Sequence, residues 1–434
     1  MRLASVIMYK KIRLLAMVGC CLISLAKAQT ENSPYSRYGL GDMVPGQNIL
    51  NRGMGGISTG YADIRSVNFA NPASYARLVT TTLDIGVELG SKTLRAVNPP
   101  RKFTAFDPNI TYLQLGIPLK KPNGGIALVF GLRPVSAIKY KIERRERLPG
   151  IDSVQTLFEG TGGSYKVNTG LAFRIKNLSV GVNAGYFFGS KNFSTRRMFI
   201  NDTVIYYKSN HATNSNFGGF FLDGGIQYTI NFNKNFLLRL GAVGNMATNM
   251  NGTKDVIRET FEYANDGTFR IDSVFEQKDI EGIVEMPSSY GFGFLLNRVD
   301  RWMFGLDYVS TKWSEYRYFG ETDLVNDSWE LRGGGQLQLK PAKSYWTYAA
   351  YRAGFIYGKD YINADGAQLK KWSVSFGVAL PMRQVAYTYQ SAIINTSIEF
   401  GQRGSKDNVV RENFFRLAIG LSLSDIWFNK RKYD

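Results

Sequence analysis

The chain has 434 residues, with 53 Lys and Arg against 35 Asp and Glu, a formal net charge of +18, one histidine and two cysteines. After residue 28 no uninterrupted apolar run reaches the roughly 18 residues that a membrane-spanning helix needs, which excludes a helical membrane protein. A single histidine cannot build a transition-metal cluster, so we expect no metal and no cofactor.

The first 28 residues have the three parts of a secretory signal peptide. A basic stretch at 9–13 precedes an apolar stretch at 14–25, and Ala-Lys-Ala at 26–28 is a small-x-small cleavage site. The apolar stretch is too short for a membrane anchor. Acylation at Cys20 is the less favoured alternative, because the residues before it fit a lipoprotein signal poorly. We predict a signal peptide over residues 1–28.

Cleavage after Ala28 would change both the cysteine content and the charge. Cys20 and Cys21 would leave with the signal, so no disulfide or thiolate site is expected in the mature chain. Removing five basic and no acidic residues lowers the net charge from +18 to +13. A basic exported protein can contact lipopolysaccharide phosphates or other anionic partners. Nucleic acid is not expected as a partner in that compartment.

Residues 29–79 differ in composition from the rest of the mature chain. They contain SPYSRYGLGD at 33–42, GMGG at 53–56 and Asn-Pro-Ala at 71–73, with little alternation of polar and apolar positions. Such a Gly-rich segment is either a disordered leader or a folded plug for the rest of the chain. Its Tyr, Ile, Phe and Met content favours the plug, which we predict over residues 29–79.

From residue 80 onward the chain repeats one pattern, in which apolar and small residues alternate. In 415–423 alternate positions give Phe, Leu, Ile, Leu and Leu on one face, and Arg, Ala, Gly and Ser on the other. In 178–186 the two faces are Leu, Val, Val, Ala and Tyr against Ser, Gly, Asn and Gly. This period of two indicates strands, since a helix would repeat every three or four residues.

The small and polar face separates a membrane barrel from a soluble sandwich. A sandwich packs two bulky faces together, whereas Gly, Ser, Ala and Asn suit a lumen that must hold something. Alternating segments of about ten residues with aromatic residues near their ends are typical of transmembrane barrels. We therefore predict an all-β, antiparallel transmembrane β-barrel over residues 80–434, with the plug inside its lumen.

Fourteen strands are predicted, and the links between them alternate in length. The links at 120–125, 176–177, 231–235 and 297–301 are short, and those at 95–109, 144–153, 201–211, 263–283 and 319–327 are long. Short turns face the periplasm in such barrels, so both termini are expected there. The predicted strands are 80–94, 110–119, 124–143, 154–175, 178–200, 212–231, 235–262, 284–297, 300–318, 328–341, 346–361, 370–381, 390–402 and 411–424.

Nothing in the sequence forms a convincing catalytic site. His211 lies in the predicted link SNHATNSN, and neighbouring residues of one loop do not assemble a catalytic triad. The glycines at 53–56 lack the strand, helix and Lys-Ser/Thr partner of a phosphate loop. The glycines at 333–335 fall inside a strand, where Gly marks a bulge or a close approach of backbone. The run at 143–147 is interpreted as a solvated loop rim that can also contact lipopolysaccharide.

Several side chains are expected to line the lumen. Asp307 and Glu399 point opposite the aliphatic faces of their strands, where water or an arginine can reach a carboxylate. Arg133 and Arg416 are candidate partners for them. Phe187 and, on another strand, Val129 are expected to form apolar parts of the lining. A structural polar lining is the more economical interpretation of the charged residues than a transport role.

Two segments resemble the FadL-type family of outer-membrane barrels, which includes fatty-acid and hydrocarbon channels and PorV-like proteins of the Bacteroidota. GMGGISTGYAD at 53–63 followed by NPAS at 71–74 resembles the N-terminal hatch of that family. MPSSYG at 286–291, the strand 302–307 and TKWS at 311–314 resemble its middle strands. The opening SPYSRYGLGD and the ending WFNKRKYD resemble barrels of the Bacteroidota in particular.

The resemblance implies a fourteen-stranded barrel in the outer membrane of a Gram-negative bacterium, closed by its own N-terminal hatch. It assigns gating roles to the matching hatch residues, which are Gly53, Gly55, Gly56, Asp63, Asn71 and Pro72. The favoured function is binding or passing of small hydrophobic molecules, with no enzymatic activity. The alternative is a non-transporting partner barrel in a secretion (type 9-like) or outer-membrane assembly complex. A continuous apolar tunnel past Asn71, with a gap in the wall, would favour transport, and a sealed lumen with a flat, aromatic-rich outer flank would favour the partner role.

Overall fold

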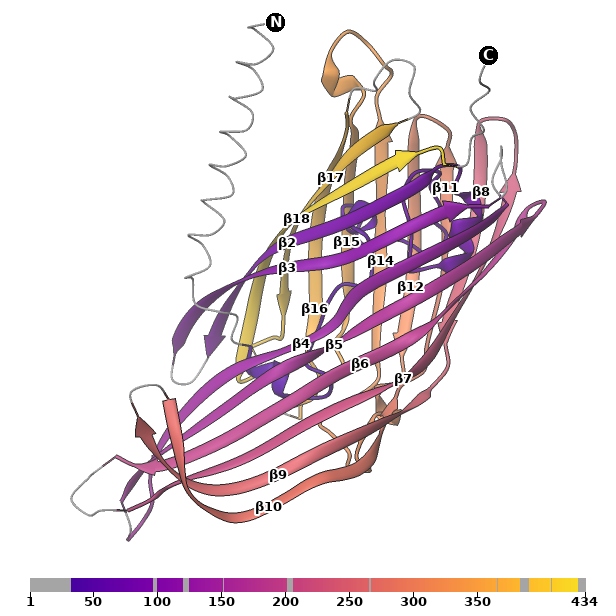
Figure 1. The fold of residues 1–434 in the computed structure, drawn as a ribbon. Coiled ribbons are helices and arrows are strands. Elements are labelled where there is room, and N and C mark those ends of the chain that lie inside the picture. Colours follow the sequence, from indigo (N-terminus) through magenta and orange to yellow (C-terminus); the bar gives the residue numbers. More distant parts are fainter. Residues whose placement is uncertain are drawn as a thin grey trace, which may run out of the picture.

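The structure, a computed structural model, describes residues 33–96, 100–119, 125–150, 152–200, 206–264, 267–364, 366–382, 390–406 and 408–427. Its strands form one closed antiparallel barrel (Figure 1) with fourteen strand positions around the wall, as predicted. β8 and β9 follow each other in one strand position of the wall, and β10 and β11 follow each other in the next. β18 pairs with β2 and so closes the barrel. No helix in the described part of the chain is long and apolar enough to cross a membrane.

The elements follow one another around the barrel in chain order. The strands are β1 (Asp42–Met43), β2 (Thr81–Ala96), β3 (Arg101–Pro118), β4 (Ile126–Arg147), β5 (Ser153–Ile175), β6 (Leu178–Phe199), β7 (Lys208–Asn231), β8 (Phe236–Asn245), β9 (Thr248–Ala264), β10 (Gly267–Met286), β11 (Ser289–Arg298), β12 (Trp302–Thr311), β13 (Arg317–Tyr318), β14 (Ser328–Gln338), β15 (Ala350–Lys359), β16 (Lys370–Pro381), β17 (Ser391–Arg403) and β18 (Val410–Asp425). The helices are short: η1 (Pro34–Arg37), α2 (Ile49–Arg52), η2 (Pro72–Arg77), η3 (Trp313–Glu315) and η4 (Tyr345–Thr347).

The alternation of the sequence becomes the two faces of the wall. The aliphatic positions of β18, such as Ile419 and Leu423, are exposed on the outside, while Ala418 and Ser422 face inward and are buried. Exposed aromatic residues lie toward both ends of these faces. Those toward the long-hairpin end include Tyr165, Phe188, Tyr308, Tyr357, Trp372 and Phe400, and those toward the short-turn end include Phe173 and Tyr228. This arrangement matches the aromatic girdles of a barrel in lipid.

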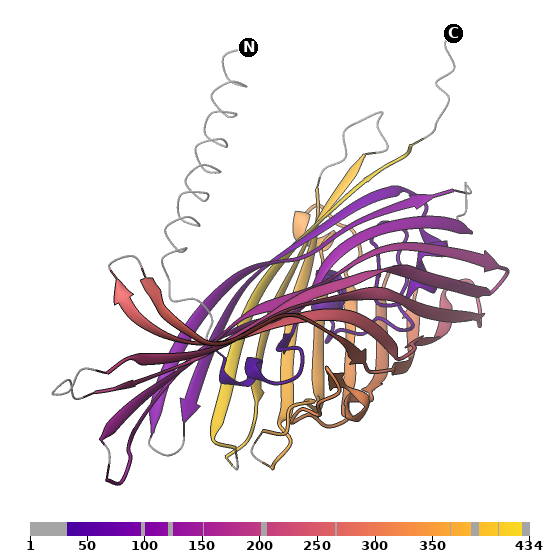
Figure 2. The ribbon, with the colours of Figure 1, turned by 60° about the horizontal axis from the view of Figure 1, so that its bottom comes forward.

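Two neighbouring strand positions of the wall, β8/β9 and β10/β11, are each interrupted, and the predicted strands there are corrected. The single strand predicted at 235–262 is broken into β8 and β9 at Met246 and Ala247, beside Pro287 between β10 and β11. The long link predicted at 263–283 is wrong, because most of it belongs to β10, which pairs with β9 in a long hairpin. Beyond the interruption, β4–β7, β9 and β10 extend past the rest of the barrel on one side (Figures 1 and 2).

Other boundaries also differ from the prediction. His211 lies within β7 and not in a link, opposite Thr195 and Arg258, and its side chain is exposed. The charged run at 143–147 is the end of β4 rather than a loop. Of the described chain, Asp425 lies at the short-turn end, whereas Ser33 contacts Glu412 near the start of β18 at the other end. The predicted signal peptide and both predicted periplasmic termini fall outside the described residues.

Residues 33–79, here called the inner segment, fill the lumen. Most of its residues are buried, although Arg37, Met43 and Ile64 are exposed, and Figure 1 shows it threading between opposite walls. It packs in separate apolar clusters: Leu50, Met54 and Ile57 against Leu295 of β11, and Val67 and Tyr75 against the walls of β4 and β5. The inner segment thus replaces the solvent that would fill an open barrel of this size.

Candidate functional site

The wall of the barrel is split between β3 and β4. These strands pair only from Leu113 to Pro118, against Ala127 to Leu132. Beyond that point the edge of β4 pairs instead with the inner segment, through Asp42 opposite Ala137 and Met43 opposite Ser136. The Val44 N–H also donates to the Val135 carbonyl at 2.9 Å. The inner segment therefore lies in the split as a short additional strand on the edge of β4; within the described residues β1 pairs with β4 and not with β3.

A cluster of buried charges holds that closure in place. The Asp42 carboxylate receives hydrogen bonds from Lys92 of β2 at 2.8 Å and from Arg403 of β17 at 2.6 Å. Arg403 also contacts Asp360 at 2.9 Å and Glu412 at 3.3 Å. Burial alone would raise the pKa of Asp42, but the charges of Lys92 and Arg403 hold it well below its ordinary value. Asp42 is therefore ionised and its removal would leave buried charge uncompensated.

A second charge cluster lies deeper in the lumen. Arg52 of α2 forms an ion pair with Glu88 of β2 and lies 3.7 Å from Glu399 of β17. Arg416 of β18 contacts Glu399 at 3.3 Å and Glu88 at 3.6 Å. Arg416 is thus the partner of Glu399, in keeping with the sequence-based pairing. No sequence pattern pointed to Arg52, which joins the inner segment to both carboxylates.

Asp307 holds the inner segment from the opposite wall. Its carboxylate is buried and accepts hydrogen bonds from the backbone N–H groups of Ser58, at 2.6 Å, and Thr59, at 2.8 Å. Neither arginine proposed as its partner contacts it: Arg416 binds Glu399, and Arg133 lies over the Phe69 ring at 5.5 Å. Backbone amides can satisfy a buried carboxylate as a guanidinium would, which is why the expected pairing was wrong.

The predicted hatch residues are structural parts of the inner segment. Asn71 caps η2 through the Ala73 N–H and donates its side-chain amide to the Thr59 carbonyl at 2.6 Å. Pro72 packs against inward glycines of β6 and β7. Asp63 accepts from the Tyr61 hydroxyl at 3.1 Å and the Arg65 N–H at 2.7 Å. Each of these residues fixes a turn within the segment.

The glycines at 53–56 permit a close approach of two backbones. Gly55 and Gly56 have φ of 67° and 75°, a region that favours glycine. The wall residues that face them are also glycines. A Cβ on Gly334 of β14 would lie 2.3 Å from the Met54 carbonyl oxygen, and a Cβ on Gly354 of β15 would lie 2.1 Å from the Gly55 nitrogen. Gly53 packs in the same way on Gly377. The small inward residues of the sequence are thus where the inner segment lies.

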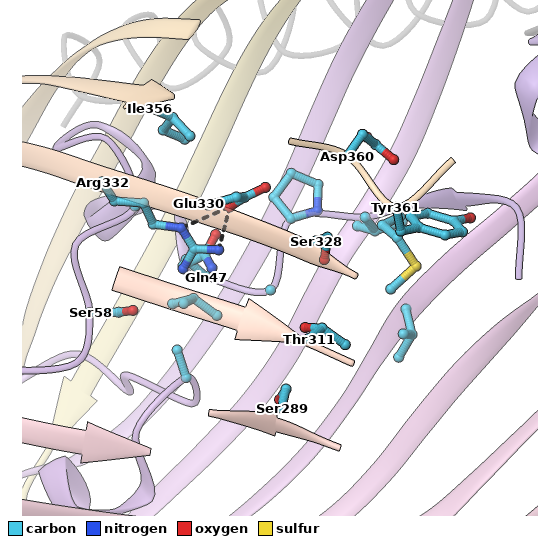
Figure 3. Close-up of a pocket in the computed structure, with 18 of the residues that line it drawn as sticks. Gln47, Ser58, Ser289, Thr311, Ser328, Glu330, Arg332, Ile356, Asp360 and Tyr361 are labelled. Atoms are coloured by element: carbon cyan, nitrogen blue, oxygen red, sulfur yellow. Dashed lines mark hydrogen bonds and ion pairs between the residues drawn. The ribbon is translucent and has the colours of Figure 1, made fainter. Parts of the chain in front are cut away.

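A cavity of about 380 Å³ remains between the inner segment and the walls. Figure 3 shows one side of it, where Glu330 pairs with Arg332 at 2.6 Å beside Gln47, Ser58 and Thr311. On the other side Lys166 contacts Asp223 at 3.2 Å. The predicted lining residues Arg133 and Phe187 border this cavity, while Val129 packs on the inner segment instead. The lining combines these ion pairs with apolar side chains such as Phe69, Val243 and Ile356.

The arrangement offers little to a catalyst or a metal. Within the described ranges no group of three or more His, Cys, Asp or Glu side chains could hold an ion. His211 lies on the exposed outer part of β7 and has no acid or nucleophile of the lumen beside it. The described part of the chain therefore offers a held plug and two charge clusters.

The family model BamG matches residues 8–434. The chain belongs to the BamG family. No curated protein matches it in sequence. Among solved structures, this BamG family member is similar to the Pseudomonas putida toluene transporter TodX, with a TM-score of 0.58. The two chains are 15% identical, and the match covers 89% of this chain and 100% of the TodX chain. It is also similar to a Pseudomonas aeruginosa FadL homologue, with a TM-score of 0.56 and 12% identity over 88% and 99% of the two chains.

A third similar structure is the monoaromatic hydrocarbon channel CymD, with a TM-score of 0.55 and 15% identity over 89% of this chain and 99% of that chain. At such identities the likeness establishes the fold alone. The BamG family member accordingly has the β-barrel fold of these FadL-type channels.

Proposed function

We propose that this protein is a non-transporting partner barrel of an outer-membrane assembly complex. Its lumen is closed by the inner segment, and its outer wall is the working surface. The observation that carries the proposal is the closure of the split wall: β1 pairs with β4, and Asp42 is locked by Lys92 and Arg403. A gate that opens in every cycle would have to break these buried contacts each time.

The outer flank supports the same function. Four exposed aromatic rings form a ladder across β5, β6 and β7, with Tyr165 and Phe188 at 5.7 Å, Phe188 and Tyr186 at 6.5 Å, and Tyr186 and Phe220 at 5.4 Å. Phe220 is 79% exposed, beside the interrupted strand position β8/β9. Large aromatic residues dominate protein interfaces, so this ladder suits contact with another membrane protein. The match to the BamG family model hints at assembly rather than secretion as the process.

The passage of small hydrophobic molecules is the second candidate function. It is favoured by the split between β3 and β4 and by the cavity behind it, since a molecule could leave sideways through such a split. TodX and CymD are a toluene transporter and a hydrocarbon channel, respectively. The buried contacts of Asp42 with Lys92 and Arg403, which hold the inner segment in the split, count against it.

Purification of the full chain from its native membrane, in mild detergent followed by mass spectrometry, tests the proposal. We expect a stoichiometric complex that contains at least one other outer-membrane barrel and survives size-exclusion chromatography. Isolation as a monomer with a bound apolar molecule would contradict the partner role and favour transport. Isolation as a monomer without a ligand would also contradict it.

A further inference from the structure

The links at the short-turn rim of the barrel are basic. In the short-turn links at 176–177, 232–235, 299–301 and 339–349 the acidic side chain is Asp300, and basic side chains stand in every link. The other rim is mixed: its described links hold Asp152, Glu315, Glu321, Asp323, Asp327 and Asp360 against Lys312 and Lys406, and exposed cations such as Arg101 and Arg144 stand at its hairpin ends. The net charge of +18 is therefore not spread evenly over the surface.

Three adjacent links bring four exposed cations together on the short-turn rim. Lys234, Arg298, Arg301 and Lys340 form this basic rim patch. Backbone hydrogen bonds tie the links side by side: the Val299 N–H donates to the Asn235 carbonyl at 2.9 Å, and the Gln338 N–H donates to the Arg301 carbonyl at 2.7 Å. In the described part of the chain these cations form no ion pair, although the Arg298 guanidinium lies over the Phe236 ring at 5.4 Å.

The depth of the patch is fixed by the apolar residues next to it. Arg301 precedes Trp302, whose ring lies 6.0 Å from that of Phe236. Val299, Leu337 and Leu339 are 40%, 50% and 40% exposed. Exposed aliphatic side chains mark the hydrocarbon region, and aromatic rings mark its boundary with the headgroups. The cations one residue further along the chain thus lie at the level of lipid phosphates.

We infer that the basic rim patch binds an anionic phospholipid, with the phosphate on the Arg and Lys side chains and an acyl chain along Val299 and Leu337. The patch satisfies both halves of such a molecule: positive charge at the headgroup level and exposed aliphatic surface directly below it. An acidic protein surface would match the charge, but it would leave those aliphatic side chains uncovered. The inference does not depend on the proposed function.

The test compares lipid retention by the full chain in detergent, offered equal amounts of phosphatidylglycerol and phosphatidylcholine and measured by native mass spectrometry. The variant Arg298→Gln/Arg301→Gln/Lys340→Gln removes three cations of the patch. The control Arg95→Gln/Arg101→Gln/Lys102→Gln removes three exposed cations from the β2–β3 hairpin at the opposite rim. Resistance to unfolding on cold SDS gels confirms that each variant is folded.

The wild-type chain and the control should retain phosphatidylglycerol over phosphatidylcholine, and the patch variant should lose about tenfold of that preference. A folded patch variant with unchanged preference would overturn the inference. So would a wild-type chain that retains both lipids equally, including the case in which an acidic protein co-purifies and protects the patch.

Discussion

Replacement of Arg403 by Met tests how firmly the inner segment closes the wall. Arg403 contacts three carboxylates, those of Asp42, Asp360 and Glu412, and its side chain is 9% exposed. Met keeps most of the volume but leaves those carboxylates with Lys92 as the nearest described cation. Loss of one member of a buried ion cluster costs about 3 to 5 kcal/mol. The docking of β1 on β4 should weaken by that amount.

Hydrogen–deuterium exchange of residues 33–46 measures this docking, because the Ser33 and Val44 N–H groups donate to β4 carbonyls. A cost of about 3 to 5 kcal/mol predicts exchange roughly 100- to 5,000-fold faster if these amides exchange through local opening. The control is Arg144→Met, since Arg144 is 67% exposed and pairs only with Glu146 on the surface; its effect should stay below about 1 kcal/mol. Equal exchange in the Arg403→Met variant and the wild-type chain would refute the locking role of the cluster.

Two further substitutions probe the fit of the inner segment to the wall. Gly334→Ala should lower the temperature at which the barrel unfolds on SDS gels, because its Cβ would meet the Met54 carbonyl. The control Gly333→Ala should have little effect, because its Cβ would meet only a leucine methyl at 3.4 Å. Similar losses of unfolding temperature in both variants would contradict the close approach. Asp307→Ala should speed exchange of residues 56–62 by leaving two buried amides unpaired, at about 2 to 3 kcal/mol, with Asp307→Asn intermediate; unchanged exchange would show that the carboxylate does not hold the segment.

The wall of the barrel was predictable because lipid imposes a simple rule on it. Each strand must present aliphatic side chains to the lipid, so the sequence alternates with a period of two wherever a strand crosses the membrane, as in 415–423. β10 has water on much of its surface and is exposed along most of its length. No such rule acts on it, and its charged sequence was interpreted as a loop. The interruption at Met246 was missed for the opposite reason, since both flanking segments alternate as one continuous strand would.

The sequence predicted that a segment of the chain fills the lumen, but it did not predict the contacts that hold this segment. The small inward face indicated that the lumen holds something, and the resemblance assigned Gly53, Gly55 and Gly56 to the hatch. The contacts that hold the segment join residues far apart in sequence, such as Asp42 and Arg403, and no local pattern connects them. Asp307 was correctly expected to face inward, but a carboxylate carries no mark that its partner is a backbone amide.

A disulfide between Met43→Cys and Ser136→Cys provides the most direct test of a permanently closed lumen. These residues are directly opposite each other on β1 and β4, and the only natural cysteines, Cys20 and Cys21, belong to the predicted signal peptide. The bond would fasten the inner segment across the split, and a reducing agent would release it. We expect cells that carry only the oxidised variant to assemble their outer-membrane barrels at the wild-type level. A defect that appears on oxidation and disappears on reduction would show that the segment must move, contrary to a partner role for a closed barrel.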